Sequence, residues 1–164
     1  MKTLFLVRHA KSSWDDDAVP DRERPLAGRG QRDAPEMGKR LARCGVRPDL
    51  MLSSPALRAR RTAELIAEKI GYEQKNLVID DRLYGACAEF LFDVIRGLND
   101  QVKSAMLFGH NPELTELARR FSGAISHMPT CAVAQFTFDA TSWKDVGPSV
   151  LAKVSFDFPK NSSA

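Results

Sequence analysis

The chain has 164 residues, of which 43% are hydrophobic and 27% are charged. This is the length and composition of one globular domain, and it excludes a disordered, collagen-like or coiled-coil chain. The 24 Lys and Arg residues against 21 Asp and Glu residues give a formal net charge of +3. An excess this small does not indicate nucleic acid or a membrane surface as a partner.

Short apolar runs rich in branched residues alternate with segments of helical period. Four runs predict strands at 4–7, 50–52, 77–79 and 105–108,. A helical pattern follows each of them, and these patterns fall within 34–44, 56–71, 91–98 and 114–121,. Pro35 is compatible with the first helix only if it lies in the first turn,. Two more strands are predicted near 131–138 and 150–158, with no helical pattern between them.

Four strand–helix repeats predict a mainly parallel sheet with helices on both faces, and the last two strands can make it mixed. The fold class is therefore α/β, as a three-layer α/β/α sandwich. With no repeat and no long linker, residues 1–158 are expected to form a single domain and residues 159–164 a short tail,.

The sequence indicates a cytoplasmic protein. Cys44, Cys87 and Cys131 are odd in number and lack metal-like spacing, which is typical of free thiols in a reducing compartment,. The apolar stretch at residues 3–7 is too short for a signal peptide, and no stretch is apolar enough to span a membrane,.

Charged and polar side chains follow each predicted strand of the parallel sheet. Arg8 and His9 come after the first strand, residues 53–58 after the second, residues 80–82 after the third, and residues 109–112 after the fourth. In open α/β sheets, ligands bind at the carboxyl ends of the strands. We therefore expect these segments to converge on one site.

Two of these segments predict helices that begin at the site. Ser54-Pro55 and Asn111-Pro112 each resemble an N-cap followed by proline at the first helical position,. Helix N-termini attract anions, and the planar guanidinium groups of Arg8 and Arg58 can each bond two phosphate oxygens,. The site is suited to a phosphoryl group.

Three motifs give a specific resemblance. They are Leu6-Val7-Arg8-His9-Ala10, Ser53-Ser54-Pro55-Ala56-Leu57-Arg58-Ala59 with Thr62-Ala63, and Gly109-His110-Asn111. In this order they resemble the signatures of the histidine phosphatase (phosphoglycerate mutase-like) superfamily. The short length and the opening at residues 8–14 most resemble its SixA-like phosphohistidine phosphatase branch.

The resemblance implies a six-stranded mixed sheet, a role for each motif residue, and no cofactor. His9 would be the nucleophile, Arg8 and Arg58 would hold the phosphate, and His110 would complete the pocket. Arg24, in Glu23-Arg24-Pro25-Leu26, matches a recurrent segment of the branch and would also touch phosphate. Nearby arginines are expected to keep His9 neutral, and with this positive charge the reaction would need no metal.

Two positions depart from the family pattern. Ala10 stands where most members have Gly, which makes the approach of the backbone tighter. Asp81 aligns with a glutamate that protonates the leaving oxygen in the mutases, and it is one methylene shorter. An imidazole leaving from phosphohistidine needs such an acid far less than an alkoxide does.

The favoured prediction is thus a metal-independent phosphatase acting on protein phosphohistidine. A phosphatase for a small phosphomonoester, with Asp81 as the acid, remains open, and so does a module that binds phosphorylated proteins without turnover. His127 is expected to be an ordinary loop residue and Arg60 and Arg61 a solvated helix face. No zinc-ligand spacing and no nucleotide-binding GxxxxGK[ST] loop occurs,.

Overall fold

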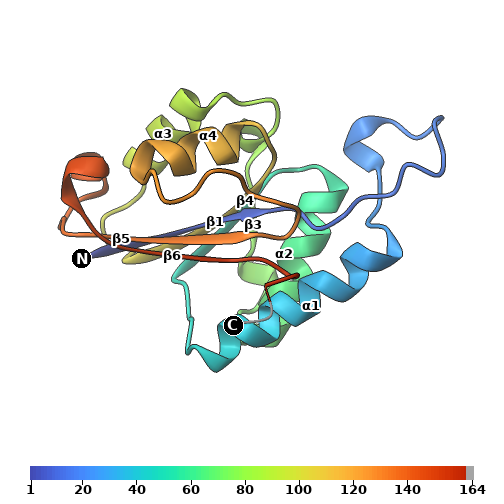
Figure 1. Cartoon of the computed structure of the whole chain (residues 1–164), viewed down its shortest axis with the longest axis horizontal. Coiled ribbons are helices and arrows are strands. Elements are labelled where there is room, and N and C mark those ends of the chain that lie inside the picture. Colours follow the sequence, from blue (N-terminus) through green and yellow to red (C-terminus); the bar gives the residue numbers. More distant parts are fainter. Residues whose placement is uncertain (162–164) are drawn as a thin grey trace.

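The computed structural model describes residues 1–161 and contains a six-stranded mixed sheet between two layers of helices (Figure 1). The strands are β1 (Lys2–Arg8), β2 (Leu50–Ser53), β3 (Val78–Ile79), β4 (Ser104–Gly109), β5 (Val133–Phe138) and β6 (Leu151–Asp157). The α-helices are α1 (Gly28–Arg43), α2 (Leu57–Ile70), α3 (Ala88–Arg96) and α4 (Glu113–Phe121). Strand order is β3-β2-β4-β1-β5-β6. The first four strands are parallel, and β5 is antiparallel to both β1 and β6. The sheet is therefore mainly parallel and mixed, as predicted.

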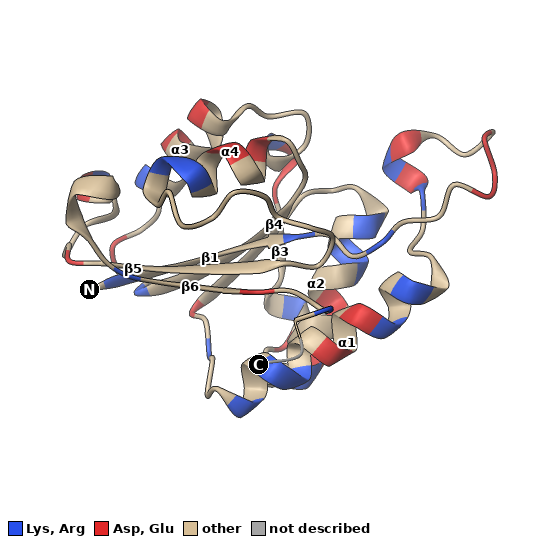
Figure 2. Ribbon diagram, viewed as in Figure 1, with Lys and Arg blue, Asp and Glu red and all other residues tan. Residues whose placement is uncertain are grey.

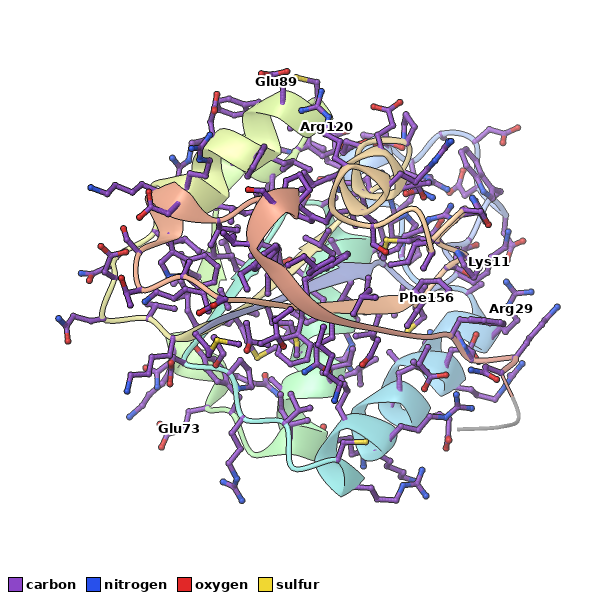
Figure 3. All side chains as sticks on the ribbon, turned by 60° about the vertical axis from the view of Figure 1, so that its left-hand side comes forward. Lys11, Arg29, Glu73, Glu89, Arg120 and Phe156 are labelled. Atoms are coloured by element: carbon purple, nitrogen blue, oxygen red, sulfur yellow. The ribbon has the colours of Figure 1, made fainter. Side chains whose placement is uncertain are left out.

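The three layers follow from strict alternation along the central strand. Leu4 and Leu6 of β1 belong to the core beneath α3 and α4, whereas Phe5 and Val7 pack on the other face with α1 and α2. All four side chains are buried, and each contributes about 1.5–3 kcal/mol by leaving water. Figure 3 shows Glu89 and Arg120 together at the outer side of the α3–α4 layer, where their charged groups are 3.3 Å apart.

Helix α1 begins earlier than its periodicity predicts. It starts at Gly28, so Pro35 lies in its interior, and the expectation that Pro35 occupies the first turn is wrong. Ala34 and Met37, on either side of the proline, are fully buried against the sheet. This packing offsets the backbone hydrogen bond that the proline cannot donate.

The first turn of α1 lies against the segment that follows β1. The Ala27 amide donates to the Lys11 carbonyl at 2.9 Å. A Cβ atom at Gly30 would lie 2.2 Å from the same carbonyl oxygen. Figure 3 labels one residue of each segment, Lys11 and Arg29, on the same side of the molecule. Only glycine permits the approach.

We therefore expect Gly30→Ala to destabilise the protein by about 1–3 kcal/mol, because the added methyl group must push the Lys11 backbone away,. Urea unfolding measures the change. Gly28→Ala is the matched control: its Cβ would meet only the Arg32 side chain, at 3.5 Å, and alanine favours a helix over glycine by about 1 kcal/mol. Equal destabilisation by both substitutions would contradict the role of Gly30.

The start of the expected tail is held against α1. The Arg40 guanidinium donates to the carbonyls of Phe158, Pro159 and Asn161 and is paired with Asp157. Residues 162–164 of the expected tail lie outside the described residues. Within residues 1–161 none of the helices has the length and apolar character needed to cross a bilayer.

Candidate active site

Two histidines stand side by side at the carboxyl end of the sheet. Arg8, the last residue of β1, is in register with Gly109, the last residue of β4, so His9 and His110 directly follow the ends of adjacent parallel strands. Their ring centroids are 5.3 Å apart, and both residues are buried. The structure thus brings together the histidines that the sequence places after the first and fourth strands.

The His9 ring has a defined orientation. Its Nδ1 lies 2.7 Å from the Ala10 carbonyl oxygen. A carbonyl can only accept, so Nδ1 carries the proton and Nε2 has a free lone pair. The Ala10 amide donates to Thr62 Oγ1 at 3.0 Å, and Thr62 Oγ1 donates to the Arg58 carbonyl at 2.7 Å. The Ala10 methyl group packs in the core with α1 and α2, which explains why alanine is tolerated there.

Three buried nitrogen atoms have no hydrogen-bond partner within residues 1–161: Arg8 Nε, Arg58 Nε and His110 Nδ1. The other contacts of the two arginines fix their direction. Arg8 Nη1 donates to the Met128 carbonyl at 3.0 Å, and both Nη atoms of Arg58 bind Asp21, through its carbonyl at 2.7 Å and its carboxylate at 3.1 Å. Buried donors normally have acceptors. We call the cluster of His9, Arg8, Arg58 and His110 at this end of the sheet the cup.

Asp21 binds Tyr84, Arg58 and Arg24 through hydrogen bonds, and we call Asp21 and Tyr84 the mouth of the cup. Its carboxylate accepts hydrogen bonds from Tyr84 at 2.6 Å, from Arg58, and from Arg24 at 3.3 Å. The Tyr84 hydroxyl and Arg58 lower the pKa of Asp21 to about 2, so the carboxyl group is ionised at neutral pH,. The edge of the Tyr84 ring faces the His110 ring at 5.7 Å. Neither Asp21 nor Tyr84 was predicted from the sequence to belong to the site.

Arg24 lies next to the cup and is buried, as its expected role requires. Its guanidinium donates to Asp21 and to the Ser13 carbonyl and stacks on the Trp14 ring at 3.5 Å. These contacts hold Arg24 in the loop between β1 and α1. Its positive charge acts on His110 from there, since it helps to lower the pKa of that histidine.

Asp81 is not brought into the cup. Its side chain is 88% exposed, and its carboxylate is 3.9 Å from Arg22. It belongs to the short 3-10 turn at residues 81–83, which follows the edge strand β3. The carboxylate that reaches the arginines is that of Asp21, from a different loop.

The two helices at the cup begin later than predicted. Ala56 and Pro112 are the N-cap residues, and neither makes a side-chain cap, so the expected caps at Ser54 and Asn111 are wrong. Both of these side chains still bond nearby amides: Ser54 Oγ accepts from Ala56 N–H, and Asn111 Oδ1 accepts from Thr115 N–H. Arg58 remains in the first turn of α2, as predicted.

Both cup histidines are neutral at pH 7. Burial lowers the pKa of His9 to about 3, with smaller contributions from His110, Arg58 and Arg8. Burial also lowers the pKa of His110 to about 4, and Arg58 adds to the effect. The predicted neutral state is present, but burial contributes more to it than the arginines do.

These pKa values make stability depend on pH in a known direction. A histidine with an ordinary pKa of 6.5 when unfolded and about 3 or 4 when folded binds its proton more tightly in the unfolded state. The free energy of unfolding therefore has its full contribution from these histidines above pH 6.5. It falls as the pH decreases towards 4, by up to about 1.4 kcal/mol per pH unit for each histidine. Asp21, with a pKa of about 2, stays ionised over this window.

Urea unfolding at several pH values between 4 and 7 measures the slope. A His9→Gln/His110→Gln double variant is expected to show a flatter dependence, because neither glutamine titrates. An identical slope in the double variant would contradict the assignment. The exposed His127 is present in both proteins, so it does not contribute to the difference between their slopes.

An open groove of about 680 Å³ lies beside the cup, between residues 20–23 and the start of α2. Pro20, Arg22, Pro55, Leu57 and Arg60 are among its lining residues. Figure 2 shows Lys and Arg positions on the 3-10 turn at residues 21–23 and on the first turns of α2, at the end of the sheet where β1 ends. No three His, Cys, Asp or Glu side chains gather as a metal site in the part of the chain that the structure describes. The three cysteines are free, as predicted.

Comparison with known proteins agrees with this geometry. Residues 4–128 match the model of the histidine phosphatase superfamily (branch 1). An uncharacterised protein of Mycobacterium tuberculosis is 33% identical over 94% of this chain and all of its own length. A chloroplastic protein of Arabidopsis thaliana, also uncharacterised, is 33% identical over 88% of this chain and 70% of its own.

The crystal structure of the putative phosphohistidine phosphatase SixA from Agrobacterium tumefaciens has a TM-score of 0.82 and 26% sequence identity to this chain. The match covers 96% of this chain and 98% of that one. The cup residues come from the segments that carry the three sequence motifs, all inside the matched region. The chain belongs to the histidine phosphatase superfamily, branch 1, and is a hydrolase of the SixA-like type.

Proposed function

We propose that this protein is a metal-independent phosphatase that removes phosphoryl groups from phosphohistidine on other proteins, through a phosphoenzyme formed on His9. The observation that carries the proposal is the cup. His9, whose Nε2 is bare, clusters with Arg8, Arg58 and His110, and each of these three residues has a buried nitrogen without a hydrogen-bond partner within residues 1–161. Such donors suit the three terminal oxygens of a phosphoryl group.

The reaction takes place in two steps. His9 Nε2 attacks phosphorus while the substrate P–N bond breaks, and the electron pair of that bond stays on the leaving nitrogen. The substrate reacts with its other ring nitrogen protonated, so the leaving group is a neutral imidazole. Water then attacks the phosphoenzyme, the bond between phosphorus and Nε2 breaks, and neutral His9 and inorganic phosphate result. In both steps the charge on the equatorial oxygens is held by Arg8, Arg58 and the His110 N–H.

The residues at the mouth favour a leaving group that departs readily. A general acid needs a pKa near the working pH. Asp21 is ionised, with a pKa of about 2, and the pKa of Tyr84 is raised by its hydrogen bond to Asp21. Asp81 is exposed and bound to Arg22. An imidazole departs with little assistance, whereas an alkoxide needs a proton, so this mouth suits phosphohistidine better than a small ester.

The surroundings of the cup fit a phosphoryl group presented on a protein surface. The groove beside it is open and has apolar and charged walls, including Pro55, Leu57 and Arg60. The Agrobacterium neighbour bears the name of a phosphohistidine phosphatase, and this supports the same substrate class here.

The test compares kcat/KM for a phosphohistidine peptide, an aryl phosphate and a phosphoglycerate. All assays contain EDTA, which should not reduce the activity because arginines rather than a metal ion supply the positive charge. The peptide is expected to rank first. Asp81→Asn should change each value by less than about twofold, since an exposed ion pair contributes little,. A tenfold or larger loss with Asp81→Asn on the esters, with an ester ranked first, would favour the phosphomonoesterase. Absence of hydrolysis for all three would identify a binding module.

A further inference from the structure

Ser54 touches the second histidine of the cup. It follows β2 and is fully buried. Its Oγ lies 2.8 Å from His110 Nε2 and also accepts a hydrogen bond from the Ala56 amide at 3.2 Å. The other ring nitrogen of His110, Nδ1, is buried and has no hydrogen-bond partner within residues 1–161. The contact therefore decides what His110 presents to the cup.

A neutral histidine can carry its proton on either ring nitrogen. If Nε2 carried the proton, it would donate to Ser54 Oγ, and the buried Ser54 hydroxyl proton would have no acceptor among the contacts of that oxygen,. Nδ1 would then direct a lone pair at an anion in the cup. If Nδ1 carries the proton, the Ser54 hydroxyl donates to Nε2, and the Nδ1–H points at the anion. Only this second arrangement gives the Ser54 hydroxyl proton an acceptor, and the Nδ1–H then finds its own acceptor in an anion bound in the cup,.

We propose that the Ser54 hydroxyl fixes His110 as the Nδ1–H tautomer and thereby makes the neutral ring a hydrogen-bond donor to the phosphoryl group. The inference rests on the proposed function, because it takes the anion in the cup to be a phosphoryl group. Ser54 is a positioning residue: it acts through the His110 ring and does not itself touch the anion.

The two histidines then share a tautomer but have opposite roles. The Nδ1–H of His9 is bound to the Ala10 carbonyl, which leaves the Nε2 lone pair for attack. The Nε2 of His110 is bound to Ser54, which leaves the Nδ1–H for the oxyanion. A nucleophile and a donor are obtained from identical side chains by binding opposite ring nitrogens.

Ring ¹⁵N chemical shifts measure the tautomer directly, without substrate or turnover. At pH 7 protonated and bare ring nitrogens give well-separated signals, and we expect protonated Nδ1 and bare Nε2 for His110. In Ser54→Ala the proton should move to Nε2 in most molecules, while Ser54→Thr, which keeps the hydroxyl, should retain it on Nδ1. His9 is the internal reference, because the Ala10 carbonyl fixes its tautomer in every variant.

Ser53→Ala is the matched control: it removes a hydroxyl as buried as that of Ser54, one that donates to the Ser54 carbonyl rather than to His110. Its His110 signals should match the wild type. An Nε2–H tautomer in the wild type, or an unchanged tautomer in Ser54→Ala, would overturn the proposal whatever the enzyme hydrolyses.

A kinetic arm tests what the tautomer does. Ser54→Ala should lower kcat/KM for an aryl phosphate by about 10- to 100-fold, somewhat less than the loss of a complete oxyanion donor. Ser54→Thr should restore most of it, and Ser53→Ala should change it little. If Ser54→Ala changes the tautomer of His110 but leaves kcat/KM unchanged, the proposed hydrogen bond from His110 to the phosphoryl group would be refuted. If the wild-type protein hydrolyses nothing, the proposed function fails, and the ¹⁵N shifts still decide the tautomer.

Discussion

Replacing His9 by alanine is expected to abolish phosphate release and covalent labelling, with a loss of at least about 10⁴-fold in kcat/KM. Nε2 of this residue has the bare lone pair of the cup, because Nδ1 is bound to the Ala10 carbonyl. With methyl in place of imidazole, the donors of the cup still face an anion but nothing attacks phosphorus. The measurement is a rapid quench after mixing with a ³²P-labelled phosphodonor. Acid-labile, alkali-stable label should appear on the wild-type protein and be absent from the variant.

His127→Ala provides the control. This histidine is exposed in the loop after α4 and is not one of the cup residues. Its removal should leave both labelling and turnover unchanged. Label that persists in His9→Ala, or that disappears in His127→Ala, would refute the assignment of the nucleophile.

Replacing Arg58 by alanine is expected to lower kcat/KM by about 10²–10³-fold, with most of the effect on kcat. The Nε of Arg58 is one of the three partnerless donors of the cup. Both Nη atoms are bound to Asp21, so the guanidinium is held in place before substrate arrives. Arg58→Lys should rescue little, because a lysine ammonium cannot bind Asp21 and direct a second donor into the cup at once.

Steady-state kinetics on an aryl phosphate measures this effect, with thermal unfolding as a check that the variant is folded. Arg60→Ala is the control. Arg60 lies two residues further along α2, is exposed, and lines the groove beside the cup. It should alter turnover of a small aryl phosphate by less than about threefold, as expected for a surface charge. Equal losses for Arg58→Ala and Arg60→Ala would indicate a general effect of charge.

The strands, and the sheet edge at which the site forms, could be predicted because burial selects apolar residues in a recognisable pattern. Leu4 to Val7 are apolar without interruption since both faces of β1 are covered. Once the strands are parallel, Arg8, His9 and His110 must meet at one edge, and the register of β1 with β4 places the two rings 5.3 Å apart. The convergence was thus determined by topology.

The contacts made by loops could not be predicted in this way. Asp21 lies in a segment without hydrophobic periodicity, and its position on Arg58, Arg24 and Tyr84 depends on how that loop folds back over the cup. Asp81 was selected from the family pattern, and its side chain points to solvent. Sequence spacing identifies which strand end a residue follows but not the direction of its side chain.

The predictions of the helix boundaries were wrong for a related reason. The residues at the start of α1 include Gly28 and Gly30, which have low helix propensity, so the pattern was visible only from Ala34 onwards,. Packing of this turn on Lys11 supplies what propensity lacks. Ser54 was likewise interpreted as a helix cap, because its contact with His110 joins residues 56 positions apart.

A crystal structure of the protein with orthovanadate would test the central claim most directly, since vanadate adopts the geometry of a phosphoryl group in transfer. We predict a bond between vanadium and Nε2 of His9, with the equatorial oxygens on Arg8 Nε, Arg58 Nε and His110 Nδ1. Vanadate bound instead among Arg22 and Arg60 in the groove, with the cup empty, would contradict the account.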